Sequence, residues 1–252
     1  MHDPMTIFIT GGTGKIGSRL VKHLLERGDT VVSTTRGGES VRSIAPDSFG
    51  KTLFSVEVDL ESDGAEKSIS KQLENQGLYP DVLIHNARNV ANLKVGEDGI
   101  TQKPAFAAEY LLAVAIPYLI SMELINASGS KVSNIIHIAS MYGVVPPNPT
   151  LYEDPAKQSP IQYGTAKAGM IHLNKELAVR LAPQGIRVNA VSYGGVEGRV
   201  SDTFLARYNT LLPMGRMLRE EEVAGPVAFL ASDASSGMTG HNLIYDGGWS
   251  VW

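Results

Sequence analysis

The residues best suited to proton transfer are Tyr163 and Lys167, which stand four positions apart in a segment of helical spacing over 161–182. At this spacing two side chains share one face of a helix. Free tyrosine has a pKa of about 10, and a fixed cation nearby favours its phenolate, so the pair could act as an acid and a base near neutral pH. Ser140 follows an expected strand and could hydrogen-bond a substrate oxygen. A solvated helix face is the alternative interpretation of the Tyr–Lys pair alone.

A glycine-rich turn at residues 10–17 follows the first expected strand and opens an expected helix. Its glycines, Gly11, Gly14 and Gly17, allow a tight turn and a close approach of the backbone to a pyrophosphate. The N-terminus of the helix adds free N–H groups and a positive dipole end. The turn therefore predicts a dinucleotide site, with an ordinary glycine turn as the alternative.

The end of the second expected strand discriminates between NAD and NADP. An acid there would bind the ribose 2′-hydroxyl, whereas a basic residue would accept a 2′-phosphate. The strand ends at Thr35 and is followed by Arg36, with no carboxylate. Because a guanidinium suits a phosphate, the sequence favours NADP(H) over NAD(H), with Lys15 as minor support. A solvated Arg36 is the alternative.

Strand-like and helical segments alternate along the whole chain and must position these groups. Expected strands cover 6–10, 30–35, 53–58, 82–85, 132–139, 186–191 and 242–245, and expected helices cover 15–27, 64–76, 104–127, 161–182 and 220–232. This pattern predicts an α/β fold, a doubly wound parallel sheet of seven strands with helices on both faces. Its ligands should bind at the carboxyl ends of the strands.

Composition narrows the classes of function. The 252 residues, 43% of them hydrophobic, suit a single domain over 1–252. The absence of cysteine excludes disulfides, thiolate metal sites and a cysteine nucleophile, and six scattered histidines predict no metal site. A net charge of −4 gives no reason to expect a nucleic acid or membrane partner. The most apolar run, residues 110–120, is interrupted by Pro117 and predicts a buried helix, and the N-terminus lacks a secretory pattern, so a cytoplasmic location is expected.

Several motifs occur in a characteristic order and spacing. They are the turn at 10–17, His85-Asn86-Ala87, Ser140, Tyr163 with Lys167, residues 187–192, 213–216, 222–232 and 238–248. Over essentially its whole length the chain resembles the single-domain oxidoreductases of the short-chain dehydrogenase/reductase family. The resemblance implies a Rossmann-type fold, hydride transfer with a nicotinamide cofactor, and a homotetramer or homodimer.

The resemblance also implies residue roles. Tyr163 would be the general acid and base, Lys167 would hold the nicotinamide ribose and favour the tyrosine phenolate, and Ser140 would position the carbonyl or hydroxyl. The expected cofactor-binding residues are Gly11, Thr13, Gly14, Lys15, Ile16, Gly17, Arg36, Asp59, Leu60, Asn86, Ala87, Tyr163, Lys167, Gly195 and Val196.

Some positions depart from the family pattern. Lys15 replaces a usual glycine, and the resulting glycine spacing resembles the extended sugar-nucleotide branch. Ala113 aligns with the helix asparagine of the family's proton relay, so proton delivery should be slower or differently routed. His85 and Arg88 stand where Asn and Gly are usual, and Tyr193 replaces a usual proline.

The segment between Ser140 and Tyr163 is longer than in most family members, which indicates an insertion at about 141–162. Its prolines would stiffen a loop, and Tyr152 beside Glu153 and Asp154 could bind a polyhydroxylated substrate such as a sugar. A longer surface loop without a ligand is the alternative. The stretch also resembles oxidoreductases of bacterial surface-sugar and flagellin-modification clusters.

The leading hypothesis is an NADP(H)-preferring oxidoreductase acting on a polar carbonyl or secondary alcohol, such as a sugar derivative. Two alternatives stay open: a cofactor-binding regulatory or scaffold protein with little catalysis, suggested by Ala113, and an epimerase or dehydratase acting on a nucleotide sugar, suggested by the glycine spacing.

Overall fold

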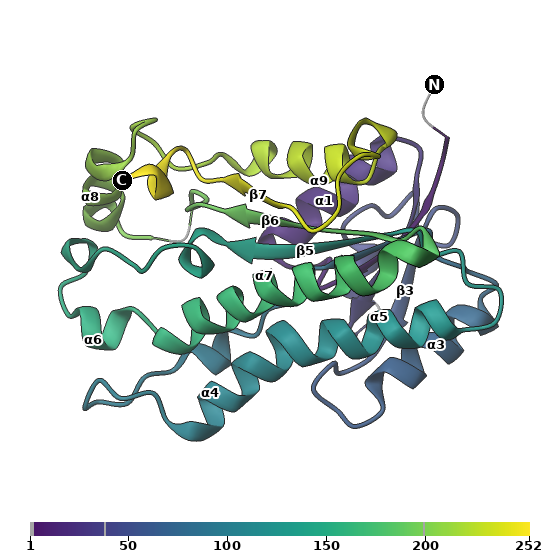
Figure 1. The fold of residues 1–252 in the computed structure, drawn as a ribbon, viewed down its shortest axis with the longest axis horizontal. Coiled ribbons are helices and arrows are strands. Elements are labelled where there is room, and N and C mark those ends of the chain that lie inside the picture. Colours follow the sequence, from purple (N-terminus) through teal and green to yellow (C-terminus); the bar gives the residue numbers. More distant parts are fainter. Residues whose placement is uncertain (1–2, 38, 199) are drawn as a thin grey trace.

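The computed structural model describes residues 3–37, 39–198 and 200–252, apart from the side chain of Glu39. Its centre is a seven-stranded parallel sheet in the order β3-β2-β1-β4-β5-β6-β7, which confirms the predicted doubly wound fold (Figure 1). The strands are β1 (Thr6–Thr10), β2 (Thr30–Thr35), β3 (Leu53–Glu57), β4 (Val82–His85), β5 (Asn134–Ser140), β6 (Arg187–Tyr193) and β7 (Asn242–Tyr245).

Helices cover both faces of this sheet. They are α1 (Lys15–Glu26), α2 (Glu39–Arg42), α3 (Ala65–Asn75), α4 (Lys103–Tyr110), α5 (Ile116–Asn126), α6 (Pro155–Gln158), α7 (Ile161–Leu181), α8 (Asp202–Leu211) and α9 (Ala224–Leu230). Helices α1 and α9 pack on one face, and α3, α5 and α7 on the other (Figure 1).

The two-sided core explains why β1, β2, β4, β5 and β6 are buried at nearly every position. In β1, Ile7 and Ile9 belong to the core under α1 and α9, while Phe8 belongs to the core under α3, α5 and α7. Successive side chains of a strand point to opposite faces, so a sheet covered on both sides buries all of them.

The expected helix over 104–127 is divided in the structure. Between α4 and α5 the residues Leu111–Ala115 form a wider, π-helical turn. Pro117 has no N–H to donate one turn back, which accounts for the disturbed hydrogen-bond ladder. The whole run Lys103–Asn126 is long and apolar enough to cross a membrane by length and composition alone, and 44% of its most apolar window is buried within the fold.

Other boundaries differ from the prediction. Strand β5 begins two residues and ends one residue later than expected, and β6 begins one and ends two residues later, so Ser140 is the last residue of β5. The short helices α2 and α6 and the longer α8 were not predicted, and the expected helix over 220–232 begins as a 3-10 turn over Glu220–Val223.

A pair of buried histidines lies in the sheet between β4 and β5. His85 and His137 are register partners, and their rings stack with centroids 5.3 Å apart. His85 Nε2 is 2.8 Å from Ser121 Oγ, and His137 Nδ1 is 3.3 Å from Asn174 Oδ1. Burial lowers the pKa of both, that of His137 to about 4, so the rings are neutral packing elements at neutral pH.

Candidate active site

A cleft of about 1120 Å³ runs along the carboxyl edge of the sheet, from the glycine turn after β1 to the segment between β5 and α7. This is where ligands of open parallel sheets bind. Every residue that the sequence analysis assigned to catalysis or to the cofactor borders this cleft. The fold therefore brings together segments from almost the whole length of the chain.

The glycine turn is packed too tightly for side chains. Gly11 has a φ of +68°, and a Cβ there would lie 2.8 Å from the Cα of Ala87. A Cβ on Gly17 would overlap the carbonyl oxygen of Gly11. Asn86 holds the turn in place, because its Nδ2 donates to the carbonyl oxygens of Thr10 and Gly11 at 3.1 and 2.9 Å. The turn is thus a preformed backbone cradle.

The first turn of α1 is open toward this cradle. Gly14 stands at the N-cap and offers no side-chain cap, so the first N–H groups of the helix remain available to an anion. Lys15 does not project freely, because its Nζ donates to the carbonyl of Val196 at 3.3 Å and lies 3.5 Å from Glu220 Oε1. Lys15 therefore links the glycine turn to the loop after β6.

The far end of the cradle is bordered by the residues after β2 and β3. Arg36 is exposed at the rim, directly after β2, and Asp59 and Leu60 follow β3. Thr34 Oγ1 accepts the backbone N–H of Gly11 at 3.1 Å, which ties β2 to the turn. This is the position at which a protein would bind the 2′-hydroxyl or 2′-phosphate of the cofactor's ribose.

Ser140, Tyr163 and Lys167 meet at the other end of the cleft, on the last residue of β5 and the first turns of α7. Ser140 Oγ accepts the N–H of Tyr142 at 3.2 Å, which leaves the hydroxyl proton free to be donated. Lys167 Nζ donates to the carbonyl of Ile138 at 2.7 Å and lies 6.0 Å from the centroid of the Tyr163 ring.

Burial changes the pKa of the charged group beside Tyr163. It lowers the pKa of Lys167 to about 8, although the carboxylate of Glu109 nearby acts in the opposite direction. The Arg88 guanidinium lies over the Tyr163 ring, 4.9 Å from its centroid, and adds a second cation.

Glu109 at the end of α4 was missed by the sequence analysis, which looked for a polar relay residue at position 113. Ala113 is buried against Ala166 and Met170 and brings no polar group to the site. Glu109, one turn earlier, is buried, and this burial raises the pKa of its carboxyl, whereas the charge of Lys167 acts in the opposite direction. The sequence signal that could have identified Glu109 is a single acidic residue within an otherwise apolar helical segment.

The end of the cleft beyond Ser140 and Tyr163 is formed largely by residues 141–162, where the sequence predicts an insertion. Tyr152 packs edge-on against Phe204 of α8, with ring centroids 5.6 Å apart, and its hydroxyl lies 3.3 Å from that of Tyr142. Glu153 and Asp154 are absent from the described lining, and Asp154 instead caps α6 through the N–H of Lys157. The remaining wall residues from 141–162 are Met141, Pro146, Pro147, Pro149, Pro155, Ser159, Pro160 and Ile161.

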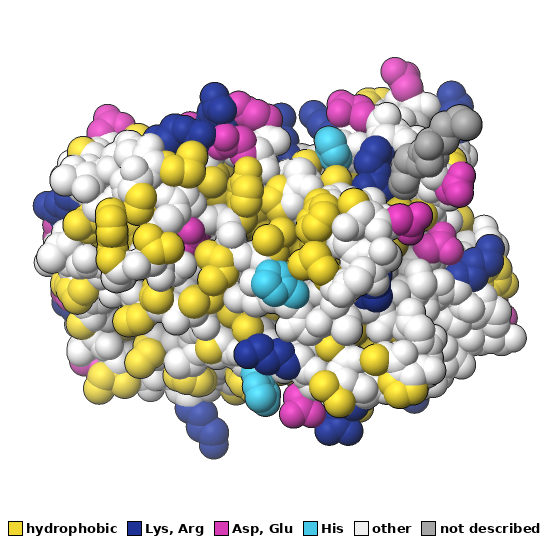
Figure 2. Space-filling view, turned by 45° about the horizontal axis from the view of Figure 1, so that its top comes forward, with side chains coloured by type: hydrophobic (Ala, Val, Ile, Leu, Met, Phe, Trp, Pro, Cys, Tyr) yellow, Lys and Arg dark blue, Asp and Glu magenta, His cyan; other side chains and the backbone are white. Residues whose placement is uncertain are grey.

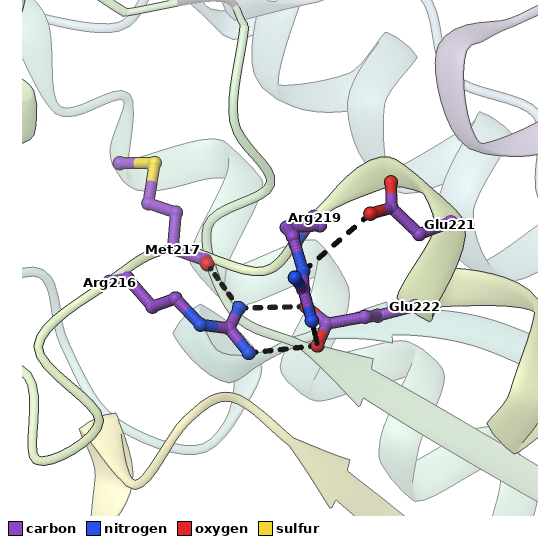
Figure 3. A network of polar contacts seen from close by, with 5 residues as sticks. All are labelled: Arg216, Met217, Arg219, Glu221 and Glu222. Atoms are coloured by element: carbon purple, nitrogen blue, oxygen red, sulfur yellow. Dashed lines mark hydrogen bonds and ion pairs between the residues drawn. The ribbon is translucent and has the colours of Figure 1, made fainter.

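A polar network fixes the chain on the β6 side. The guanidinium of Arg216 donates to both carboxylate oxygens of Glu222 at 2.8 Å, and Arg219 adds a backbone and a side-chain donor (Figure 3). These hydrogen bonds lower the pKa of Glu222 to about 2, and the largest contribution comes from Arg216. The segment they fix includes Leu218, whose N–H donates to the carbonyl of Gly195 at 2.9 Å beside the cleft.

Comparison with known proteins identifies the family. A family model described as enoyl-(acyl carrier protein) reductase matches residues 13–250. The chain belongs to the short-chain dehydrogenase/reductase family, whose members are NAD(P)-dependent oxidoreductases acting on CH–OH or carbonyl groups. The family predicted from the sequence motifs is therefore confirmed.

Three similar proteins illustrate the relationship. The chain is 28% identical over 261 residues to post-translational flagellin modification protein A of Campylobacter coli, covering 100% of both chains. It is 29% identical over 250 residues to an uncharacterized short-chain type dehydrogenase/reductase of Sinorhizobium fredii, of which it spans 43%. The crystal structure of a short chain dehydrogenase from Leptospira borgpetersenii with bound NAD+ superposes with a TM-score of 0.85 at 32% identity, covering 98% of this chain and 93% of that one.

Proposed function

We propose that this protein is an NADP(H)-preferring oxidoreductase that interconverts a polar carbonyl and a secondary alcohol, such as a sugar derivative. One observation carries the proposal: a single cleft joins a glycine cradle with an uncapped helix N-terminus to Ser140, Tyr163 and Lys167. The chain over 1–252 would act as one catalytic domain, with the insertion at about 141–162 as its substrate wall.

The cradle fits a nicotinamide dinucleotide. The turn at 11–17 would hold the pyrophosphate, Asp59, Leu60, Asn86 and Ala87 would line the adenosine end, and Gly195 and Val196 would meet the nicotinamide. When bound, the cofactor supplies or accepts the hydride. The glycine cradle, in which a Cβ on Gly17 would overlap Gly11, supports this fit independently of the family.

The side chains around Tyr163 would handle the proton. Ser140, whose lone pair is engaged by Tyr142, would donate its O–H to the substrate oxygen and hold it beside Tyr163. Tyr163 would give its proton to that oxygen during reduction and take it back during oxidation. Lys167 and Arg88 would stabilise the phenolate that forms between these events.

Arg36 supports the preference for NADP(H), because an exposed guanidinium at the rim after β2 suits a 2′-phosphate. NAD(H) is the competing cofactor, since the Leptospira relative was solved with NAD+. For the substrate, the similarity to the Campylobacter flagellin modification protein supports a sugar derivative, and the paired hydroxyls of Tyr142 and Tyr152 would bind it in place of the two acids first considered.

We also propose a cytoplasmic homotetramer or homodimer that binds neither nucleic acid nor membrane. Exposed apolar side chains on the run 103–126, namely Phe106, Tyr110, Leu111, Tyr118 and Leu119, would be covered by a second copy of this chain. A second apolar group includes Ile244 of β7, Val251 and Trp252. Figure 2 shows hydrophobic side chains gathered over the centre and left of the face that carries β7 and α9. Light scattering of the wild type and of Leu119→Asp tests this: a monomeric wild type would contradict it.

The test of the proposed function is a fluorescence titration with NADPH and NADH, followed by turnover of keto-sugar and simple carbonyl substrates. We expect tight NADPH binding, weaker NADH binding and NADPH oxidation with at least one carbonyl. Binding without turnover would instead favour the regulatory or scaffold role, and failure to bind either nucleotide would overturn the proposal.

A further inference from the structure

An arginine at the catalytic end of the cleft has no acidic partner. Arg88 follows β4, borders the cleft and is exposed, and its guanidinium carbon lies 4.9 Å from the centroid of the Tyr163 ring. Among the residues that the structure describes, none forms an ion pair or a hydrogen bond with the Arg88 side chain. Its N–H donors are therefore available to a molecule in the cleft.

The acids that border the cleft are engaged elsewhere. Glu61, after β3, accepts hydrogen bonds from the side-chain amides of Asn89 and Asn92 at 2.8 and 3.0 Å. Asp59 accepts the backbone N–H of Glu61 at 3.1 Å. The described lining of the cleft includes no other acid. A carboxylate that pairs with Arg88 would therefore have to belong to a bound molecule.

The segment that carries Arg88 is anchored to the helix that carries Tyr163. The Gln162 side chain is fully buried, and its Nε2 donates to the backbone carbonyls of Asn92 and Lys94 at 3.0 and 3.2 Å. The residue directly before Tyr163 thus fixes the chain shortly after Arg88. An arginine on such an anchored segment loses less conformational entropy when a ligand binds than one on a free loop.

The wall beyond Ser140 and Tyr163 offers no second charge. Within the described lining, the residues from 141–162 and from α8 are all uncharged, and most of them are apolar. Lys167 is buried, and its Nζ already donates to the carbonyl of Ile138 at 2.7 Å. Arg88 is therefore the exposed charge that a substrate would meet beside the Tyr163 ring.

We propose that Arg88 binds a carboxylate of the substrate, which makes the substrate an acidic carbonyl or alcohol compound; this inference rests on the proposed oxidoreductase function. The parallel N–H donors of a guanidinium match the two oxygens of a carboxylate. Because Arg88 lies over the Tyr163 ring, the carboxylate would lie close to the reacting carbon, as in a keto acid or an acidic sugar. This contact would orient the reacting oxygen toward Ser140 and Tyr163.

The test is a calorimetric titration with matched acids and esters, namely pyruvate, acetoacetate and levulinate, each beside its methyl ester. Keto compounds cannot be reduced in the protein–NADP+ complex, so binding is measured there without turnover, and the titration is repeated without nucleotide. We expect at least one acid to bind roughly tenfold or more tightly than its ester, as a charge-assisted bidentate pair allows.

Variants of Arg88 assign this preference to the guanidinium. In Arg88→Met the acid and its ester should bind equally, while Arg88→Lys, which keeps the charge but not the fork of donors, should retain part of the preference. Arg42→Met, on the exposed surface of α2, is the control and should bind both as the wild type does. The Kd for NADPH should stay within about twofold of the wild type in all three variants.

Two results would overturn the carboxylate site. If no acid binds more tightly than its ester to the wild type, Arg88 is merely solvated. If the preference for the acid survives in Arg88→Met, another group binds the carboxylate; a weaker binding of both NADPH and NADH in that variant would then assign Arg88 to the cofactor.

Initial rates keep this inference separate from the proposed function. If acids and esters are reduced with equal kcat/KM in the wild type, the oxidoreductase function holds and the carboxylate site fails. If acids bind through Arg88 but no carbonyl compound is reduced with NADPH or NADH, the carboxylate site holds and the proposed function fails.

Discussion

The guanidinium carbon of Arg88 lies 4.9 Å from the centroid of the Tyr163 ring, and Lys167 Nζ lies 6.0 Å from the same centroid. Two cations therefore face the ring whose oxygen would carry negative charge during turnover. The family resemblance leads us to expect a glycine at position 88, so the guanidinium of Arg88 is a charge that the resemblance does not predict. Such a cation stabilises a phenolate by direct electrostatic attraction.

Replacing Arg88 with methionine removes this charge while keeping a flexible side chain of similar length. We expect kcat for reduction to fall roughly tenfold, the equivalent of about 1.4 kcal/mol, with little change in the Kd for NADPH. Arg42→Met, on the exposed surface of α2, provides the control. Steady-state kinetics and fluorescence titration test both values, and an Arg88→Met enzyme with wild-type kcat would show that the second cation is dispensable.

Tyr163→Phe removes the proposed proton donor without altering the packing of the ring. Turnover should fall by about 10²- to 10⁴-fold while NADPH still binds. Tyr142→Phe is an informative comparison, because burial raises the pKa of the Tyr142 hydroxyl and keeps it protonated. That variant should change KM more than kcat, and unchanged turnover in Tyr163→Phe would contradict the assigned role.

The pH dependence of reduction should report Lys167. Burial lowers its pKa to about 8, so the ammonium is present below this pH and is lost as the pH rises through it. The kcat/KM for reduction should therefore fall above pH 8. In Lys167→Arg the guanidinium stays charged, so the residual activity should lack this decline. Initial rates across the pH range provide the measurement, and a decline of the same midpoint in Lys167→Arg would assign it to another group.

The cofactor preference can be tested with Arg36→Ala. Removing the guanidinium should raise the Kd for NADPH roughly tenfold or more and leave the Kd for NADH nearly unchanged, because only NADPH carries the 2′-phosphate. Arg42→Ala removes the same charge from a position on α2 and is the matched control. If Arg36→Ala raises the Kd for NADPH and the Kd for NADH equally, Arg36 does not bind the 2′-phosphate.

The buried histidine pair predicts a loss of stability in acid. His137 has a folded-state pKa of about 4, below the value of about 6.5 expected in the unfolded chain. Between these pH values the unfolded chain binds a proton that the folded protein does not, so the free energy of unfolding falls as the pH falls, by up to about 3 kcal/mol. Urea unfolding at a series of pH values should show a shallower fall in His137→Gln than in His172→Gln, whose side chain is 73% exposed.

The strands were the most predictable part of the fold. β1, β2 and β4 begin and end where the β-branched runs do, because such residues favour parallel strands that are buried on both faces, and the half-exposed edge strand β7 also has its predicted bounds. Helix α8 gave no comparable pattern, since only Tyr208 among its residues is fully buried. Its position depends on contacts with the insertion, which are distant in sequence.

The candidate site was predictable where motifs lie in single loops and unpredictable where a helix is irregular. The glycine turn, Ser140 and Tyr163 all border the expected cleft. Ala113, where the family resemblance predicts an amide, brings no polar group to the site, and the buried acid of this helical run is Glu109, just before the widened turn at Leu111–Ala115. The role of Lys15 as a link to Val196 and Glu220 also depends on a contact across the fold that no local pattern reveals.

The insertion is held at both ends by the groups that would react. It leaves Ser140 at the end of a buried strand and returns to Tyr163 at the start of a long helix, so its two anchors are rigid while its middle forms the wall of the cleft. Residues 144–160 could therefore be exchanged for the corresponding loop of a relative without moving the reacting groups. We therefore expect changes within this segment to alter which molecules enter the cleft while Ser140 and Tyr163 stay in place.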